Sequence, residues 1–234
     1  MKKISFLLLA LFIIACGKEQ HDLTVKAHIK GLKKGTLYLK KVEDTTLVTI
    51  DSLVVNGNSN IELHSDLDSP EIFYLYLDKN SAEKDRITFF ADKGITEINT
   101  TLKNFAFEVD IKGSEQQKTL EEYFTVISKI NNRNLENFKE QFEAQKAGDT
   151  AKLTLLKKEG NNTLKRKYLY TVNFALNNKN SEVAPYLALT EIYNARIDLL
   201  DTINKSLTPK VKASKYGKEL NAFINKIKTT ETNK

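Results

Sequence analysis

The chain has 234 residues and carries 36 lysines and arginines against 30 aspartates and glutamates, a formal net charge of +6. Basic and acidic residues are interleaved along the sequence and form no basic block, which argues against a nucleic-acid-binding surface. Cys16 is its one cysteine, so the chain has no second thiol for an internal disulfide or a redox pair.

The first fifteen residues have the parts of an export signal. Lys2 and Lys3 precede an apolar run over residues 4–14, and the small residue Ala15 stands directly before Cys16. As a helix this run would rise about 16 Å, too little for the roughly 30 Å of a bilayer core. The arrangement resembles the bacterial lipoprotein signal, in which the cysteine is lipidated and becomes the first residue of the mature chain. We therefore expect a signal peptide over residues 1–15, lipidation of Cys16 and a lipidated linker over residues 16–22.

Residues 23–112 have the pattern of short β-strands. Val25, Ala27 and Ile29 alternate with polar residues, and Asn56-Gly57 is a strong hairpin signal, because both residues tolerate positive φ. Some eight short strands at roughly ten-residue spacing predict an antiparallel β-sandwich. The last three expected strands cover residues 87–91, 95–101 and 105–111.

At Gly113 the apolar period changes to that of a helix. One stripe runs from Leu120 to Phe142, and Gly148-Asp149 separates it from a second helix, with Asp149 as the expected N-cap. A third helix is expected from Ser181 through Ile203 and a final one after Thr208-Pro209. The predicted class is thus α+β, with an all-α domain over residues 113–228 and a frayed tail over 229–234. We favour packing within the chain for each apolar stripe; a partner-binding surface is the alternative.

Residues with catalytic or metal-binding chemistry are few. His21, His28 and His64 have no second ligand at helical spacing, and the segment from His64 to Asp68 lacks the glycine and distal glutamate of a calcium loop. No phosphate loop or nucleophile motif is present in the sequence. We expect no catalytic residue, no cofactor and no metal. Asp51-Ser52 is expected to bond its own turn backbone.

Short motifs in both halves resemble a bacterial lipoprotein family, domain of unknown function 4369. They are Ala27-His28-Ile29-Lys30-Gly31, the turn at Gly35, Ile50-Asp51-Ser52 and Asn56-Gly57, with Ser214 to Leu220 in the helical part. The resemblance implies an N-terminal module that in its family precedes a thioredoxin-like thiol–disulfide oxidoreductase domain. We expect this chain to lack that domain and its Cys-x-x-Cys pair, and therefore the thiol-exchange activity.

These observations lead to three hypotheses about function. The first is a non-catalytic envelope lipoprotein, lipid-anchored at the outer membrane on its periplasmic face or at the cell surface, which binds or scaffolds a protein or an envelope ligand. The second is an accessory partner of a separate thioredoxin-like lipoprotein in the periplasm. The third and weakest is an enzyme that uses carboxylates such as Asp66 and Asp68.

Overall fold

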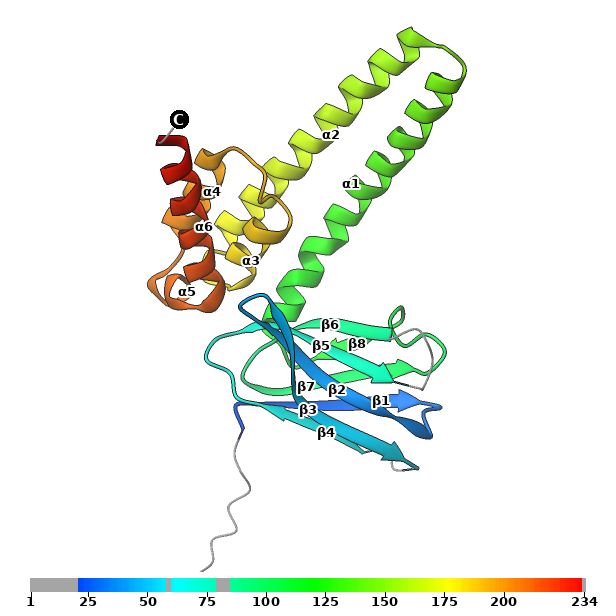
Figure 1. Ribbon diagram of the computed structural model, residues 1–234, viewed down its shortest axis with the longest axis vertical. Coiled ribbons are helices and arrows are strands. Elements are labelled where there is room, and N and C mark those ends of the chain that lie inside the picture. The colour runs from blue at the N-terminus through cyan, green and yellow to red at the C-terminus, as the bar shows by residue number, and fades with distance from the viewer. Residues whose placement is uncertain (1–20, 58–59, 79–84, 233–234) are drawn as a thin grey trace, which may run out of the picture.

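The computed structural model describes residues 21–57, 60–78 and 85–232, in which a strand-rich half is followed by a helical half (Figure 1). Cys16 and the signal peptide lie outside the described residues. The fold is α+β, as predicted. The strands are β1 (Leu23–Lys30), β2 (Lys34–Glu43), β3 (Thr46–Asn56), β4 (Ile61–Ser65), β5 (Glu71–Asp78), β6 (Asp85–Ala91), β7 (Gly94–Thr101) and β8 (Asp110–Lys112).

These strands form two four-stranded sheets. Sheet A has the order β4-β1-β7-β8 and sheet B the order β3-β2-β5-β6. All pairings are antiparallel except that of β1 with β7, which run parallel from Leu23 opposite Gly94 to Lys30 opposite Thr101. A parallel pair needs a long crossover, and here the chain between them builds the whole of sheet B and β4. The expectation of a purely antiparallel sandwich is therefore corrected at this one pair.

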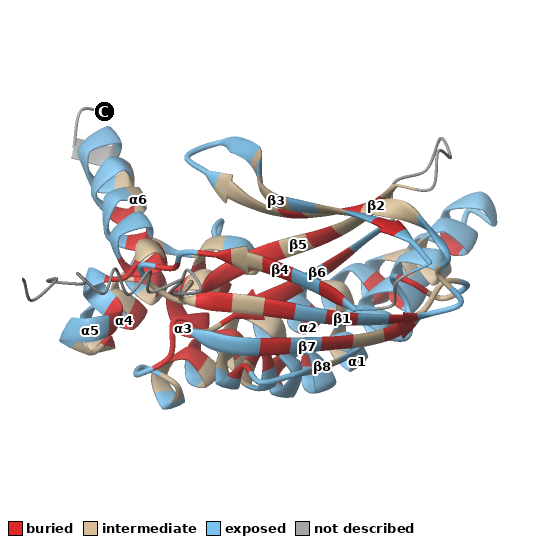
Figure 2. Ribbon diagram, turned by 90° about the horizontal axis from the view of Figure 1, so that it is seen from below, coloured by how far each residue is buried: buried red, intermediate tan, exposed pale blue. Residues whose placement is uncertain are grey.

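The core of the sandwich consists of the inward-facing residues of both sheets. Burial alternates along the strands (Figure 2), as the period of two requires. The expected strand over residues 105–111 is wrong for most of its length, because residues 102–109 form a turn ahead of the short β8. Phe105 is buried in the core from this turn, and the Thr100 hydroxyl lies within hydrogen-bond distance of the carbonyls of Asn104, Phe105 and Glu108.

Two long antiparallel helices form a hairpin that projects from the sandwich (Figure 1). α1 (Glu115–Lys146) begins at Ser114, whose hydroxyl accepts a hydrogen bond from the Gln117 amide at 3.0 Å. α2 (Thr150–Asn177) begins at Asp149, whose carboxylate accepts from the Lys152 amide at 2.9 Å, so the predicted N-cap is confirmed.

Four shorter helices follow: α3 (Val183–Thr190), α4 (Ile197–Ser206), α5 (Pro209–Ala213) and α6 (Lys215–Thr232). The single helix expected from Ser181 through Ile203 is therefore two helices. Ile192, in the turn between them, and Ile203 of α4 lie in the same helical core. The tail expected to fray over residues 229–234 overlaps the last turn of α6, which ends at Thr232. Among the described residues, no helix combines the length and apolar character needed to cross a bilayer.

A third apolar cluster, which we call the junction cluster, joins the strand-rich half to the helical half. Ile72 and Phe90, on the outer face of sheet B, pack against Leu120 and Tyr123 of α1 and against Tyr216 of α6. Residues of α3 complete this cluster. The helical half is therefore built directly onto one face of the sandwich.

Candidate functional site

Three of the residues considered for metal binding lie close together: the rings of His21 and His64 stack with their centroids 5.1 Å apart, and His21 lies 3.3 Å from Asp66. The His64 ring also lies beside the Thr24 hydroxyl at 3.3 Å. His28 is exposed on β1. Within the described ranges, no group of three or more histidine, cysteine, aspartate or glutamate side chains is placed to hold a metal ion.

Asp51 bonds to backbone, as predicted, but within a strand and not in a turn. One carboxylate oxygen accepts from the Ser52 amide at 2.7 Å and the other from the His64 amide of β4 at 2.8 Å. Asp51 lies next to the register shift between Leu39 and Lys40 of β2. Its carboxylate therefore links β3 to β4, which belong to different sheets.

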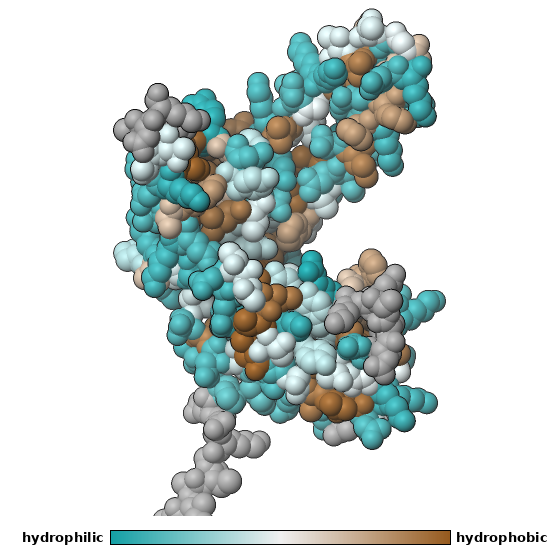
Figure 3. Space-filling model, in the orientation of Figure 1, coloured by the Kyte–Doolittle hydropathy of each residue, from teal (hydrophilic) through white to brown (hydrophobic). Residues whose placement is uncertain are grey.

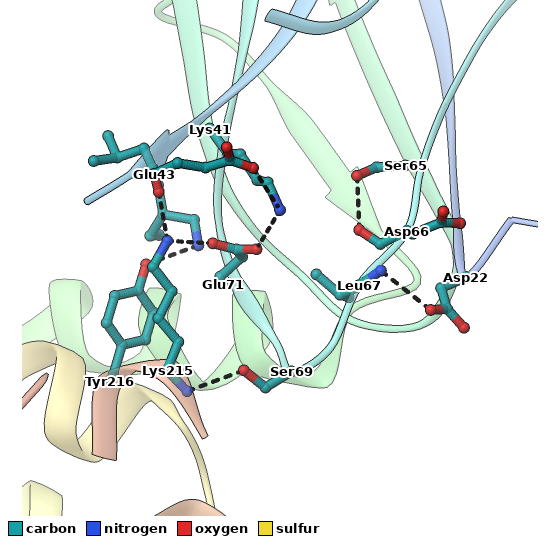
Figure 4. A network of polar contacts seen from close by, with 12 residues as sticks. Asp22, Lys41, Glu43, Ser65, Asp66, Leu67, Ser69, Glu71, Lys215 and Tyr216 are labelled. Atoms are coloured by element: carbon teal, nitrogen blue, oxygen red, sulfur yellow. Dashed lines mark hydrogen bonds and ion pairs between the residues drawn. The ribbon is translucent and has the colours of Figure 1, made fainter. Parts of the chain in front are cut away.

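The junction of the two halves contains an ion cluster around Glu71 (Figure 4). The Glu71 side chain is only 7% exposed and lies between Lys41, at 3.2 Å, and the ammonium of Lys215. Lys215 also donates to the Val42 carbonyl at 2.6 Å, and its backbone amide donates to the Ser69 hydroxyl at 3.1 Å. The Lys215 contacts link the start of α6 to sheet B and to the loop before β5, and the Lys41–Glu71 pair joins β2 to β5, so the cluster is structural.

Glu182 is a second buried polar residue at this junction. It borders a hollow of about 450 Å³, which Asp68, Asp92 and Lys210 also line. The Gln116 side chain donates to Glu182 at 2.9 Å, and the Ser181 hydroxyl donates back to Gln116 at 2.5 Å. Burial raises the pKa of the Glu182 carboxyl, which the nearby Lys210 opposes. A raised pKa suits a general acid, but here the carboxylate accepts from Gln116 in a network that connects α1 to the start of α3.

The inner face of α1 packs on α2. The Tyr123 hydroxyl meets that of Thr171 at 2.8 Å, and the buried Asn137 amide donates to the Leu156 carbonyl at 3.0 Å. A Cβ on Gly160 would lie 3.0 Å from the Asn137 side-chain oxygen, so the glycine permits this close approach. This face of the helix is fully used within the chain.

A second face of α1 is not covered. We call Phe124, Leu135, Phe138 and Phe142 the α1 stripe; their exposed fractions are 41%, 54%, 69% and 53%. Leu135, Phe138 and Phe142 lie eighteen residues, about five full turns, beyond Gln117, Leu120 and Phe124. They therefore continue the face with which α1 rests on the sandwich.

At its base this face is attached to β6. The Phe90 amide donates to the Gln117 side chain at 2.8 Å, and Leu120 packs in the junction cluster. Beyond Phe124 the hairpin leads away from the strands and leaves an open notch (Figure 3). Packing within the chain, the favoured interpretation of this stripe, therefore holds for Leu120 but not for Leu135, Phe138 and Phe142. The apolar periodicity of α1 is visible in the sequence, whereas the extension of the helix beyond the sandwich is visible only in the structure.

Part of the chain matches a known protein family. Residues 23–120 match the family model described as Domain of unknown function (DUF4369). The matched region covers both sheets and continues into the first turns of α1, including Gln117 and Leu120. No curated protein matches the chain.

Proposed function

We propose that this protein is a non-catalytic envelope lipoprotein, anchored through Cys16 at the outer membrane of a Gram-negative cell, that binds or scaffolds a protein partner through the α1 stripe. The observation that carries the proposal is the exposure of Leu135, Phe138 and Phe142 on one face of α1, whose inner face packs on α2. A contiguous exposed apolar surface of this kind is typical of protein contact sites.

The composition of the stripe supports a specific contact. Interface cores are enriched in aromatic residues, and three of the four stripe residues are phenylalanines. Helix positions at this spacing fit the mode in which a helix face contributes anchors at i, i+3, i+4 and i+7. The base of α1 is attached to β6 by the Gln117 contact and by the apolar cluster around Leu120, which supports a stripe that is presented beyond the sandwich.

A second candidate is an accessory role beside a separate thioredoxin-like lipoprotein. It is supported by the DUF4369 match over residues 23–120. The resemblance described above implies that modules of this family precede thioredoxin-like domains. This candidate differs from the first in the identity of the partner, and the same experiment separates the two.

The test is chemical crosslinking in intact cells, followed by capture of the chain from detergent-solubilised membranes and identification of its partners. We expect Phe138→Gln to lose a specific partner that the wild-type chain captures. Leu155→Gln is the matched control, because Leu155 is also 69% exposed but lies on α2, outside the stripe. Equal capture by both variants would remove the stripe from the proposal. A thioredoxin-like partner would favour the accessory role.

A further inference from the structure

The outer face of sheet B carries a group of three tyrosines and two cations, distinct from the α1 stripe. We call it the tyrosine platform: Tyr38 and Lys40 from β2, Tyr74 and Tyr76 from β5, and Arg86 from β6. Tyr38 is registered opposite Tyr76, which is registered opposite Arg86, so these three form one row across the sheet. Lys40 and Tyr74 lie opposite each other in the next row.

The five side chains are connected through their two cations. The Lys40 ammonium lies 5.4 Å from the ring centre of Tyr38 and 5.0 Å from that of Tyr76. Arg86 lies 5.5 Å from the Tyr74 ring centre, and its guanidinium donates to the Tyr76 hydroxyl at 3.3 Å. Neighbouring strands are about 4.8 Å apart, so the row from Tyr38 to Arg86 spans about 10 Å.

The cations of the platform differ from others on the sandwich in their partners. Within the described part of the chain, neither Lys40 nor Arg86 has a carboxylate within ion-pair distance, whereas Lys41 pairs with Glu71 and Lys26 with Glu62. A hollow of about 240 Å³ opens beside Lys40, bordered by Tyr38, Tyr76 and Asp78. Two positive charges therefore lie next to aromatic rings, and that of Lys40 also borders the hollow.

We propose that the tyrosine platform binds an anionic carbohydrate, with a sugar ring packed on the tyrosines and its carboxylate or sulfate held by Lys40 and Arg86. The negative face of an aromatic ring attracts the polarised C–H bonds of a pyranose, and a guanidinium binds a carboxylate or sulfate through charge-assisted hydrogen bonds. The platform lies on a sheet face, where its tyrosines occupy neighbouring strands. This activity is independent of the α1 stripe.

The test is isothermal titration of the purified chain with two probes, trigalacturonate and a sulfated heparin hexasaccharide. We expect at least one to bind, with affinity falling about tenfold or more in Arg86→Gln and in Lys40→Gln, since each removes a charged hydrogen-bond partner. Lys26→Gln, on the outer face of sheet A, is the matched control and should bind as the wild type does. Circular dichroism would verify that each variant is folded.

Three further arms make the proposal falsifiable. Fully methyl-esterified trigalacturonate has the same rings without the charge, and equal binding of it would overturn the role of the cations. Hexaglutamate binding as tight as that of the sugars would indicate an acidic-peptide site instead. Failure of both anionic sugars to bind, or unchanged binding by Arg86→Gln and Lys40→Gln, would also overturn the proposal. Phe138→Gln should bind the sugars as the wild type does. A failure of sugar binding would therefore leave the proposed role of the α1 stripe untouched, and a failure of partner capture would leave the tyrosine platform untouched.

Discussion

The hydroxyl of Tyr216 accepts a hydrogen bond from the backbone amide of Ile72 at 3.0 Å, and this contact joins residues 144 positions apart in the sequence. Tyr216 is buried between the rings of Phe90 and Tyr186, at centroid distances of 5.8 and 5.2 Å. Burial raises the pKa of its hydroxyl well above the ordinary value, so the group is neutral at physiological pH.

Tyr216→Phe tests the strength of this contact. The change keeps the ring but leaves the Ile72 amide without its acceptor in a buried site, so we expect a loss of about 1–3 kcal/mol in the free energy of unfolding. Urea denaturation followed by circular dichroism would measure it. Tyr193→Phe is the control, since Tyr193 is 56% exposed, and should change stability little. Equal effects in the two variants would contradict the assigned role.

The ion cluster predicts a non-additive pair of substitutions. Glu71→Ala removes the carboxylate that Lys41 and Lys215 share and leaves Lys41 with Glu43 alone, and we expect a loss of about 3 kcal/mol in the free energy of unfolding. Adding Lys215→Met removes one of the two cations and should recover part of the loss. A double-mutant cycle by urea denaturation measures the coupling. Additive losses would mean that the pair does not contribute as a unit.

Glu182 predicts a pH dependence. Burial raises the pKa of its carboxyl in the folded chain above the ordinary 4.5. The folded state therefore binds the proton more tightly than the unfolded chain, and this group lowers stability as the pH rises from 4.5 through the folded pKa. Glu182→Gln retains an acceptor for Gln116 and should flatten this decline, which denaturation between pH 4.5 and 7.5 would detect.

The two faces of α1 should respond differently to truncation. Ile127 is fully buried in the junction cluster, so Ile127→Ala should cost about 2–5 kcal/mol. Phe138→Gln should alter stability by no more than about 0.5 kcal/mol, because the side chain is exposed. Thermal and urea unfolding of both variants would measure the difference. A large loss in Phe138→Gln would show that the stripe is covered within the chain.

The lipid anchor is tested at Cys16, which lies outside the described residues. We expect Cys16→Ser to abolish lipidation and to move the chain from the membrane fraction to the soluble fraction or to block its processing. A chain expressed from Gly17 should not partition into detergent. Equal detergent partitioning of that shorter chain would contradict anchoring through Cys16.

The sequence predicted local elements well and their spatial consequences poorly. Alternation in Val25, Ala27 and Ile29 and the N-cap at Asp149 are local signals, and the structure confirms both. The segment after Thr101 was misassigned because a buried Phe105 in a turn has the same apolar character as a strand residue. The parallel pairing of β1 with β7 depends on which edge the later strand reaches, and no local pattern encodes it.

The candidate sites were limited in the same way. The spacing of Phe124, Leu135, Phe138 and Phe142 was visible, but their exposure depends on how far α1 extends past the strands that it touches at Gln117. Tyr38, Tyr76 and Arg86 are far apart in sequence, and only the strand register makes them one row. The exposure of a side chain and its neighbours on adjacent strands are both set by the assembled fold, so neither could be predicted from local sequence patterns.

The position of β1 determines how the sandwich would bear mechanical load. This strand is the first described strand after the linker predicted over residues 16–22, and it is hydrogen-bonded on one side to β4 and on the other to β7. Tension applied through the linker along the strand axis would strain the ladders on both sides together, instead of peeling an edge strand away one bond at a time. A chain held by its N-terminus would therefore be pulled at the strand that sheet A restrains on both flanks.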